Sequence, residues 1–156
     1  MMGLRWLEHK VPPPLVGALV GLGMWWLASL GPAIALNDTV RLVLAGGLVL
    51  VALTFDLAGL LVFRASRTTI NPLAPQRAST LVTGGVYRIT RNPMYVGMGF
   101  MLLAWAVYLA ALWPFLGPLM FVLYITRFQI LPEERALQQL FGDAYTQYTA
   151  RVRRWL

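Results

Sequence analysis

Long apolar stretches separated by short polar segments run along the chain and predict membrane-spanning helices. A bilayer core requires about 20 consecutive apolar residues per helix. Four stretches meet or approach that length: residues 15–36, 42–63, 94–112 and 114–131. A polar segment, residues 64–93, separates the two pairs, and a segment with one apolar face follows at residues 132–156. We therefore expect an all-α integral membrane protein, a single membrane domain over residues 1–156, with about four transmembrane helices and an amphipathic C-terminal helix.

The composition supports a lipid environment. Hydrophobic residues make up 58% of the 156 residues and charged residues 12%, which is about half the charged fraction of a soluble domain. There is no cysteine, which excludes disulfides, thiolate metal sites and a cysteine nucleophile. The one histidine, His9, lies in the N-terminal leader, so we expect no metal site.

The positive charges predict how the chain is oriented in the membrane. The net charge is +7, and of the 13 lysines and arginines only Arg41 falls between the first two stretches or the last two. Positively charged loops remain in the cytoplasm, so both termini are expected there, in a bacterial-type inner or plasma membrane. The expected partners are the bilayer and a lipophilic substrate. Nucleic acid is not expected, and the oligomeric state is left open.

The first apolar stretch has a second interpretation as a cleaved signal peptide. Ala33-Ile34-Ala35 fits a cleavage site with small residues. The apolar run is longer than the hydrophobic region of a typical signal peptide, which favours a retained helix.

Residues 64–93 are a first candidate for chemistry, because a structureless loop of this length is uncommon unless it is functional or disordered. Gly84-Gly85 permits a close turn, and Pro93 suits the first turn of a helix. The free amides of that turn, with Arg91 beside them, would attract an anion. The alternative is that Arg91 only sets topology and Tyr95 belongs to an interfacial aromatic belt.

The acidic pair Glu133-Glu134 is a second candidate. After Pro132 the pair reads as an ordinary helix start favoured by the helix dipole, and Gly142 is expected to stop that helix. Alternatively, a carboxylate at the membrane surface could bind ribose hydroxyls or balance a cation. Asp56, inside the second stretch, is expected to make a structural pair, with Arg127 as the candidate partner.

Both candidate segments resemble one known family. Residues 79–87 read STLVTGGVY and residues 91–97 read RNPMYVG, which resembles the "LVTxGxYxxxRHPxYxG" signature of the isoprenylcysteine carboxyl methyltransferase family. Residues 132–152, with PEE, FG, two tyrosines and RV in order, are similar to that family's C-terminal tail. The related phospholipid methyltransferases share a looser version. The resemblance covers roughly residues 64–156.

The resemblance implies an S-adenosylmethionine site beneath a lipid-accessible active site. By position, the expected cofactor-binding residues are Thr80, Leu81, Val82, Tyr87, Asn92, Pro93, Met94, Tyr95, Glu133 and Glu134. The expected catalytic residues are Arg91, Asn92, Tyr95 and Glu134. Asn92 replaces the family's usual histidine.

The residues expected to bind substrate depart from the family. Where the isoprenylcysteine enzymes carry an arginine for the substrate carboxylate, this chain has Gln129, with Arg127 two residues earlier. This departure weakens the case for a prenylcysteine substrate, so the acceptor is expected to be a lipophilic carboxylate or amine. An amine would need a base, for which Glu134 and Tyr95 are the nearest candidates.

The resemblance thus implies an S-adenosylmethionine-dependent methyltransferase acting on a lipophilic acceptor at the cytoplasmic face. Two alternatives stay open. A membrane reductase of sterol-like lipids would need a nicotinamide site, for which no GxGxxG motif after a strand exists. A non-enzymatic membrane scaffold would keep the motifs as structure only.

Overall fold

The computed structural model describes residue 8 and residues 10–66 and 80–156. Its main helices are α1 (Pro13–Ala28), α2 (Asp38–Ala65), α3 (Pro93–Leu109), α4 (Leu116–Ile125) and α5 (Leu131–Arg151). Two short 3-10 helices, η3 (Gly85–Arg88) and η4 (Trp113–Phe115), and a π-helical turn, η5 (Thr126–Ile130), complete the fold. All of these elements are helical, which confirms the predicted all-α class.

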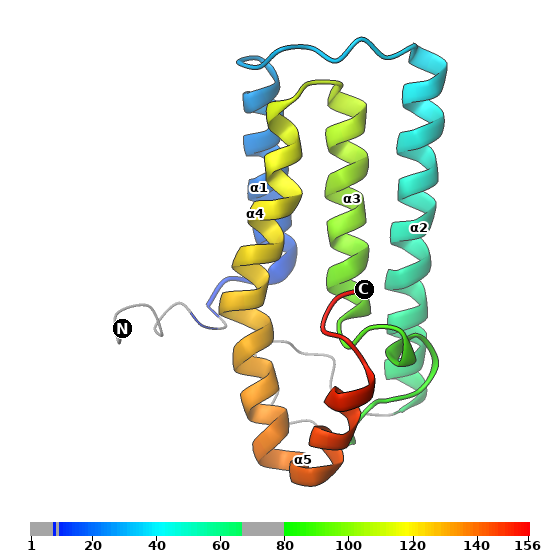
Figure 1. Ribbon diagram of the computed structural model, residues 1–156, viewed down its shortest axis with the longest axis vertical. Helices are drawn as coiled ribbons and strands as arrows, with labels where there is room; N and C mark the ends of the chain where they lie inside the picture. Colours follow the sequence, from blue (N-terminus) through cyan, green and yellow to red (C-terminus); the bar gives the residue numbers. More distant parts are fainter. Residues whose placement is uncertain (1–7, 9, 67–79) are drawn as a thin grey trace.

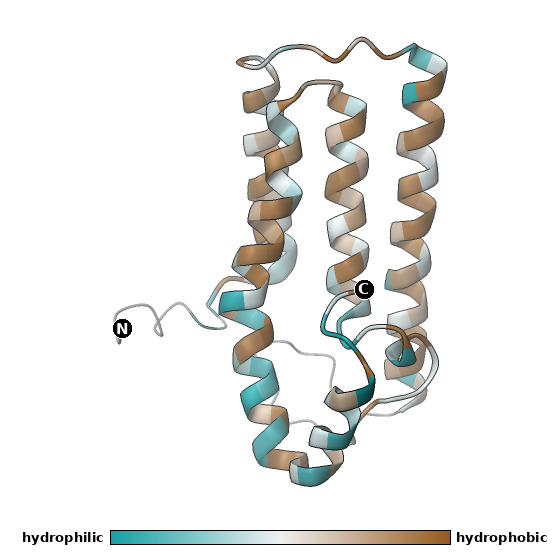
Figure 2. Ribbon diagram, viewed as in Figure 1, coloured by the Kyte–Doolittle hydropathy of each residue, from teal (hydrophilic) through white to brown (hydrophobic). Residues whose placement is uncertain are grey.

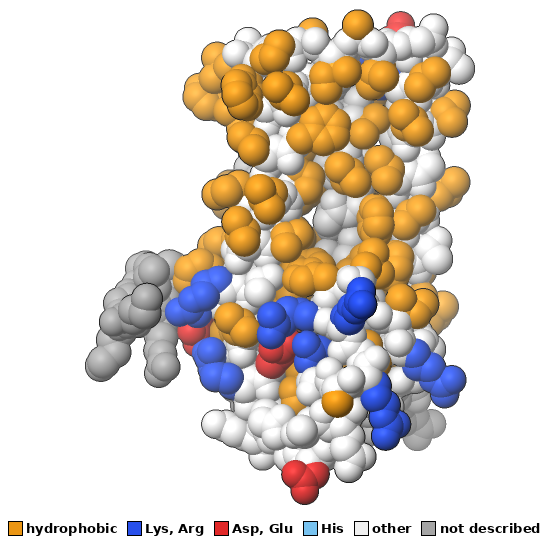
Figure 3. Space-filling view, in the orientation of Figure 1, with side chains coloured by type: hydrophobic (Ala, Val, Ile, Leu, Met, Phe, Trp, Pro, Cys, Tyr) orange, Lys and Arg blue, Asp and Glu red, His pale blue; other side chains and the backbone are white. Residues whose placement is uncertain are grey.

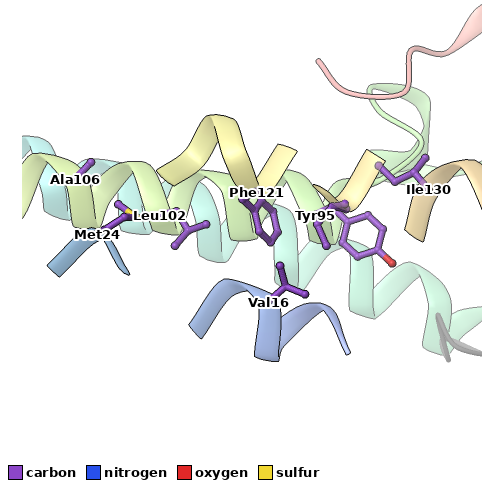
Figure 4. Close-up of a cluster of buried hydrophobic side chains, with 8 residues drawn as sticks. Val16, Met24, Tyr95, Leu102, Ala106, Phe121 and Ile130 are labelled. Carbon is purple, nitrogen blue, oxygen red and sulfur yellow. The ribbon is translucent and has the colours of Figure 1, made fainter. Parts of the chain in front are cut away.

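The long helices stand side by side, with α3 in the middle (Figure 1). α2 packs chiefly along α3, whereas α1 and α4 pack against each other and against the other side of α3. The cluster of buried side chains lies on that second side, and Figure 4 shows it as a row that includes Met24, Phe121 and Val16. Tyr95, from the first turn of α3, ends the row beside Ile130.

α1 is shorter than the predicted stretch of residues 15–36. It ends at Ala28, and the following chain is extended rather than helical. Pro32 has no N–H for a helical hydrogen bond and its ring would clash with the carbonyl of Ala28, which favours the end of α1 at that residue. The extended chain instead bonds to the α3–α4 connection, with Ile34 N donating to Ala110 O at 2.7 Å and Leu112 N donating to Pro32 O at 3.1 Å.

The second and third predicted stretches are helices close to their expected bounds. α2 begins after Asn37, whose side chain accepts hydrogen bonds from the backbone of Thr39 and Val40, an N-cap that satisfies otherwise free amides. α3 begins with Pro93 in its first turn, as predicted.

The fourth stretch and the C-terminal segment form one helix, not two. α3 ends at Leu109, where the C-cap residue Ala110 has a φ of 47°, and η4 then leads into α4, which continues through η5 into α5 without a break before Pro132. A proline inside a helix clashes with the carbonyl four residues earlier, here Phe128, and the wider π turn makes room for it. The predicted stop at Gly142 is found, because its φ of 48° and ψ of −121° interrupt α5 and turn the chain back (Figure 1).

Two of these helices are long and apolar enough to cross a membrane: α2 and the continuous helix from Trp113 to Arg151. α1 and α3 are apolar but have only 16 and 17 residues. Large apolar side chains such as Leu22, Val43 and Leu50 are more than 60% exposed, which favours lipid over water as their surroundings. The layout with four spans remains a prediction.

The charged side chains gather at one end of the molecule. Figure 2 shows the apolar upper part of the helices, and Figure 3 shows arginines and acids over the end formed by α5 and the chain leading into α3. At the opposite end Arg41 forms an ion pair of 2.9 Å with Asp38. The predicted one-sided charge distribution is therefore present in the described residues.

Candidate functional site

The start of α3 is tied to the C-terminal end of the chain. Arg91 N donates a hydrogen bond to Arg153 O at 2.9 Å. Asn92 Nδ2 and Thr90 Oγ1 both donate to Arg154 O, at 2.8 and 3.2 Å. Asn92 makes no side-chain cap for α3, and its amide instead holds the C-terminal segment beside the helix start.

The acidic pair also contacts this part of the chain, and its two carboxylates have different partners. Tyr95 donates a hydrogen bond of 2.6 Å to Glu133 Oε1. Glu134 accepts from both Nε and Nη2 of Arg154, at 2.9 and 2.7 Å, and forms an ion pair of 3.1 Å with Arg91. The two-pronged contact with Arg154 is the strong geometry for an arginine and a carboxylate.

Glu133 lies beyond the apolar part of its helix, which ends at Leu131, yet it is largely surrounded by protein. Burial raises the pKa of Glu133 to about 8, and Glu134 next to it acts in the same direction, although the hydrogen bond from Tyr95 opposes the shift. A carboxyl group with such a pKa exchanges protons near neutral pH, which is the property of a functional acid or base.

Further tyrosines border the acidic pair. Tyr87 is buried in η3, packs edge-on against Phe63 of α2, and accepts a hydrogen bond at its backbone oxygen from Tyr148 at 2.7 Å. Burial, followed by Tyr148 and Glu133, raises the pKa of Tyr87. Burial and Glu134 raise the pKa of Tyr145 to about 12, against the opposing effect of Arg91. Tyr87 and Tyr145 therefore lie close enough to the carboxylates to be influenced by their charge.

The turn that begins η3 requires glycine, as the Gly84-Gly85 pair predicted. Gly85 has a φ of +57°, a conformation that other residues rarely adopt. A Cβ atom there would lie 2.7 Å from Val62 Cγ2. Close packing of this turn on α2 places Tyr87 against Phe63.

One buried donor in the cluster is free. Arg91 Nε has no hydrogen-bond partner among the residues that the structure describes, although its side chain is only 13% exposed. A buried unsatisfied donor is costly, and an anionic group bound beside Glu134 would satisfy it. The residues present therefore fit a ligand that combines a cation for Glu133 with a carboxylate for Arg91.

The structure brings together six of the predicted site residues: Tyr87, Arg91, Asn92, Tyr95, Glu133 and Glu134. Other predicted residues lie apart from them. Pro93 and Met94 pack against Gly59 of α2, and Thr80 is exposed. Leu81 is half-exposed and Val82 is buried, and no hydrogen bond links the two to the acidic pair among the described residues.

The two predicted substrate-binding residues contact the N-terminal segment instead of the acidic pair. Arg127 forms an ion pair of 3.0 Å with Glu8, which Arg135 also contacts. Gln129 Nε2 donates to Val11 O at 2.7 Å. The expected pairing of Asp56 with Arg127 was therefore wrong. Asp56 lies against Gly97 of α3, where a glycine leaves room for its carboxylate.

Sequence reasoning missed Arg154 and gave no site role to Tyr145 and Tyr148. The three residues lie 54 to 63 positions after Arg91 along the chain, and they reach it because Gly142 turns the chain back. The signal available was the cluster of basic residues at 151–154, which was interpreted only as a determinant of topology.

Comparison with known proteins identifies the class. Residues 40–144 match the family model of the phospholipid methyltransferases, a family related to the isoprenylcysteine carboxyl methyltransferases. The chain belongs to the phospholipid methyltransferase family, as the resemblance of its motifs predicted. The family consists of membrane methyltransferases, in agreement with the apolar helices.

A similar protein is found in Haemophilus influenzae, where its function is uncharacterised. The two are 44% identical over 63 residues, which are 40% of this chain and the whole of the other. No solved structure matches the chain.

Proposed function

We propose that this protein transfers a methyl group from S-adenosylmethionine to a lipophilic acceptor at the cytoplasmic membrane face. Four spans with both termini in the cytoplasm are part of the proposal. The observation that supports it most strongly is the largely enclosed acidic pair, Glu133 and Glu134, held against the start of α3 by Tyr95 and Arg91.

The cluster has the groups that the cofactor requires. S-adenosylmethionine supplies a methyl group on a positively charged sulfur, and it also carries an ammonium group, a carboxylate and a ribose diol. Glu133 suits the positive groups or the ribose hydroxyls, and the free Nε of Arg91 suits the carboxylate.

The two carboxylates are suited to different tasks. Glu134 is held by Arg91 and Arg154, so its oxygens are already engaged in ion pairs, and we assign it a positioning role in place of the predicted role as base. Glu133 is largely surrounded by protein, accepts one hydrogen bond from Tyr95 and has its pKa raised to about 8. It is therefore the better proton acceptor near neutral pH.

The reaction itself is a displacement. A lone pair of the acceptor forms a bond to the methyl carbon, the carbon–sulfur bond breaks, and its electron pair remains on sulfur. An acceptor that carries an N–H or O–H loses that proton to Glu133 and then to water. The site lies where the apolar helices end, so a lipid can approach from the membrane while the water-soluble cofactor approaches from the other side.

Methyl transfer tests the proposal. The purified full-length protein in detergent is incubated with S-adenosylmethionine labelled in the methyl group and with a total lipid extract, and the labelled lipids are identified by mass spectrometry. We expect labelled lipid with the wild type and at least about tenfold less with Glu133→Gln, since a charge-assisted contact and a base are both lost.

The matched control is Asp143→Asn, which neutralises an exposed carboxylate of α5 and should leave the rate unchanged. Absence of any labelled product with the wild type would contradict the proposal. A nicotinamide cofactor that raises the melting temperature, with no effect of S-adenosylhomocysteine, would instead favour the alternative membrane reductase.

A further inference from the structure

A groove in the apolar surface lies between α3 and α4 and has a volume of about 450 Å³. This volume is within the range of about 300–1,000 Å³ that is usual for sites of small molecules. Every residue that lines the groove is apolar or glycine, so a ligand that fills it must also be apolar. The lining includes Val96, Gly99 and Leu103 of α3, Val122 of α4, and Trp155 and Leu156 of the C-terminal segment.

Gly99 keeps the groove open on the α3 side. A Cβ atom on Gly99 would meet no other atom within 4 Å, whereas one on Gly97 would lie 2.8 Å from the Ala52 carbonyl oxygen of α2. α3 therefore presents a closely packed face to α2 and an unfilled face to the groove. The atoms along an unfilled space lack dispersion contacts, and a chain bound there would supply them.

The C-terminal segment separates the groove from the acidic pair. It crosses the start of α3 (Figure 1), where Asn92 Nδ2 donates a hydrogen bond of 2.8 Å to Arg154 O. The side chain of Arg154 contacts Glu134. The next side chain, Trp155, instead lines the groove and donates from Nε1 to Thr126 Oγ1 at 3.1 Å. A ligand in the groove is therefore held beside the candidate site and not in it.

Positive charge accompanies the polar end of the groove. Arg153 precedes Trp155 by two residues, and its backbone forms a bridge with Thr90, two residues after Arg88. Both arginines are exposed, and neither forms an ion pair with a residue that the structure describes. Ile89 beside them is 61% exposed, and an exposed apolar side chain among positive charges suits a membrane surface. The groove and the arginines thus match the two parts of an anionic lipid.

We propose that the groove binds one acyl chain of an anionic phospholipid, whose headgroup contacts Arg88 and Arg153. The apolar helices on both sides place the groove within the bilayer, where acyl chains are the surrounding medium. The chain fills the unfilled face of α3, and the arginines select a headgroup with a net negative charge. This lipid is a resident ligand and not the methyl acceptor, because the C-terminal segment lies between it and the acidic pair. The inference does not depend on the proposed methyl transfer.

Native mass spectrometry tests the inference on the full-length protein. The wild type is purified in detergent, stripped of lipid, and titrated with palmitoyl-oleoyl phosphatidylglycerol or with the phosphatidylcholine that carries the same two chains. We expect one phosphatidylglycerol per protein chain, bound at least about fivefold more tightly than phosphatidylcholine, since a single arginine near an anionic lipid contributes about that factor. Equal affinity for the two lipids, or no bound lipid, would overturn the inference.

Two kinds of variant separate the groove from the charge. Gly99→Leu fills the groove and should weaken the binding of both lipids by at least about fivefold, because the site is then overpacked. Arg88→Gln and Arg153→Gln leave the groove intact, and each should weaken the binding of phosphatidylglycerol alone by about fivefold.

The matched controls are Gly46→Leu, at a glycine of α2 that also has open surroundings, and Arg41→Gln, at the opposite end of the molecule. Both should bind the two lipids as the wild type does. Unchanged lipid affinity in Gly99→Leu, or an equal loss in Gly99→Leu and Gly46→Leu, would overturn the inference, as would unchanged phosphatidylglycerol affinity in both arginine variants.

Other occupants of the groove would give different results. A dimer that dissociates in Gly99→Leu would assign the groove to a second copy of the chain. A bound lipid that gains the mass of a methyl group when S-adenosylmethionine is added would assign it to the acceptor, and either result would overturn the inference. Selective binding of phosphatidylglycerol by a wild type that does not bind S-adenosylhomocysteine would support the inference and contradict the proposed function alone.

Discussion

The apolar seam between α2 and α3 and the polar cluster below it are held together by different means. Along the seam, small residues allow the two helices to approach closely, so that a Cβ atom on Gly97 would lie 2.8 Å from the Ala52 carbonyl oxygen. In the cluster, side chains bond across long intervals of sequence, such as Asn92 with Arg154 and Tyr95 with Glu133. The contact between α2 and α3 therefore depends on close packing, so an added atom there is destabilising. The cluster instead depends on hydrogen bonds and ion pairs, and on the charges of the groups that form them.

The largest expected effect breaks the seam. Gly97→Val adds atoms against a rigid backbone oxygen and the Asp56 carboxylate, and overpacking of this kind costs at least about 2 kcal/mol. We expect a clear fall in melting temperature in detergent. Gly46→Ala, where a Cβ meets no neighbour, should leave stability unchanged or slightly raised, since alanine favours helix. An equal loss in both variants would refute the close-packed seam.

The next effect concerns charge in the cluster. Burial raises the pKa of Glu133 from its ordinary value of 4.5 to about 8, so the folded protein retains a proton that the unfolded chain has released. The free energy of unfolding should therefore be highest below about pH 4.5 and fall as the pH rises toward 8.

Binding of a positively charged cofactor should show the opposite trend. Binding requires the ionised carboxylate of Glu133. The affinity for S-adenosylmethionine should therefore increase by up to about tenfold for each unit that the pH rises toward 8, and it should level off above pH 8. Calorimetry at several pH values measures the slope. The same slope in Glu133→Gln would assign the titration to another group.

A smaller effect comes from the link between the cluster and the C-terminus. Arg154→Ala removes the two-pronged contact with Glu134, which leaves Arg91 as the carboxylate's partner. Because the Arg154 side chain is 35% exposed, we expect a loss of about 1 kcal/mol. Thermal unfolding measures it, with Arg151→Ala at an exposed position as the control. A neutral result in Arg154→Ala would show that the C-terminus does not support the cluster.

These two regions also differ in how far the sequence predicts them. Hydrophobic runs locate α2 and α3 because length and composition suffice for a helix in lipid, and the resemblance of the motifs selected Tyr95, Arg91 and the acidic pair. The sequence does not reveal the continuous path through Pro132, which depends on a π turn. Arg154 was missed because its contact with Glu134 exists only after the turn at Gly142. Local sequence patterns therefore predict helices, whereas the members of a site that is built from distant segments can be identified only once the three-dimensional structure is known.

The smallest expected effect concerns the start of α2, at the opposite end of the molecule from the cluster. It tests whether a loss of stability there leaves cofactor binding unchanged. Asn37→Ala removes the N-cap of α2, at an exposed position, and should cost about 0.5–1 kcal/mol. Cofactor affinity should be unchanged, because Asn37 is far along α2 from the cluster. Thermal unfolding and calorimetry on the same sample measure both quantities, and Asn37→Asp, which retains a capping oxygen, should be close to the wild type. A fall in affinity would contradict independence.

The central claim is that the cluster of Arg91, Tyr95, Glu133 and Glu134 binds S-adenosylmethionine. Calorimetric titration of the purified wild type with S-adenosylhomocysteine at pH 8 tests it most directly, in parallel with Glu133→Gln and the control Asp143→Asn. We predict saturable binding to the wild type and to Asp143→Asn, and affinity at least about tenfold weaker for Glu133→Gln. Absence of binding to the wild type at millimolar ligand, or equal affinity in all three proteins, would contradict the claim.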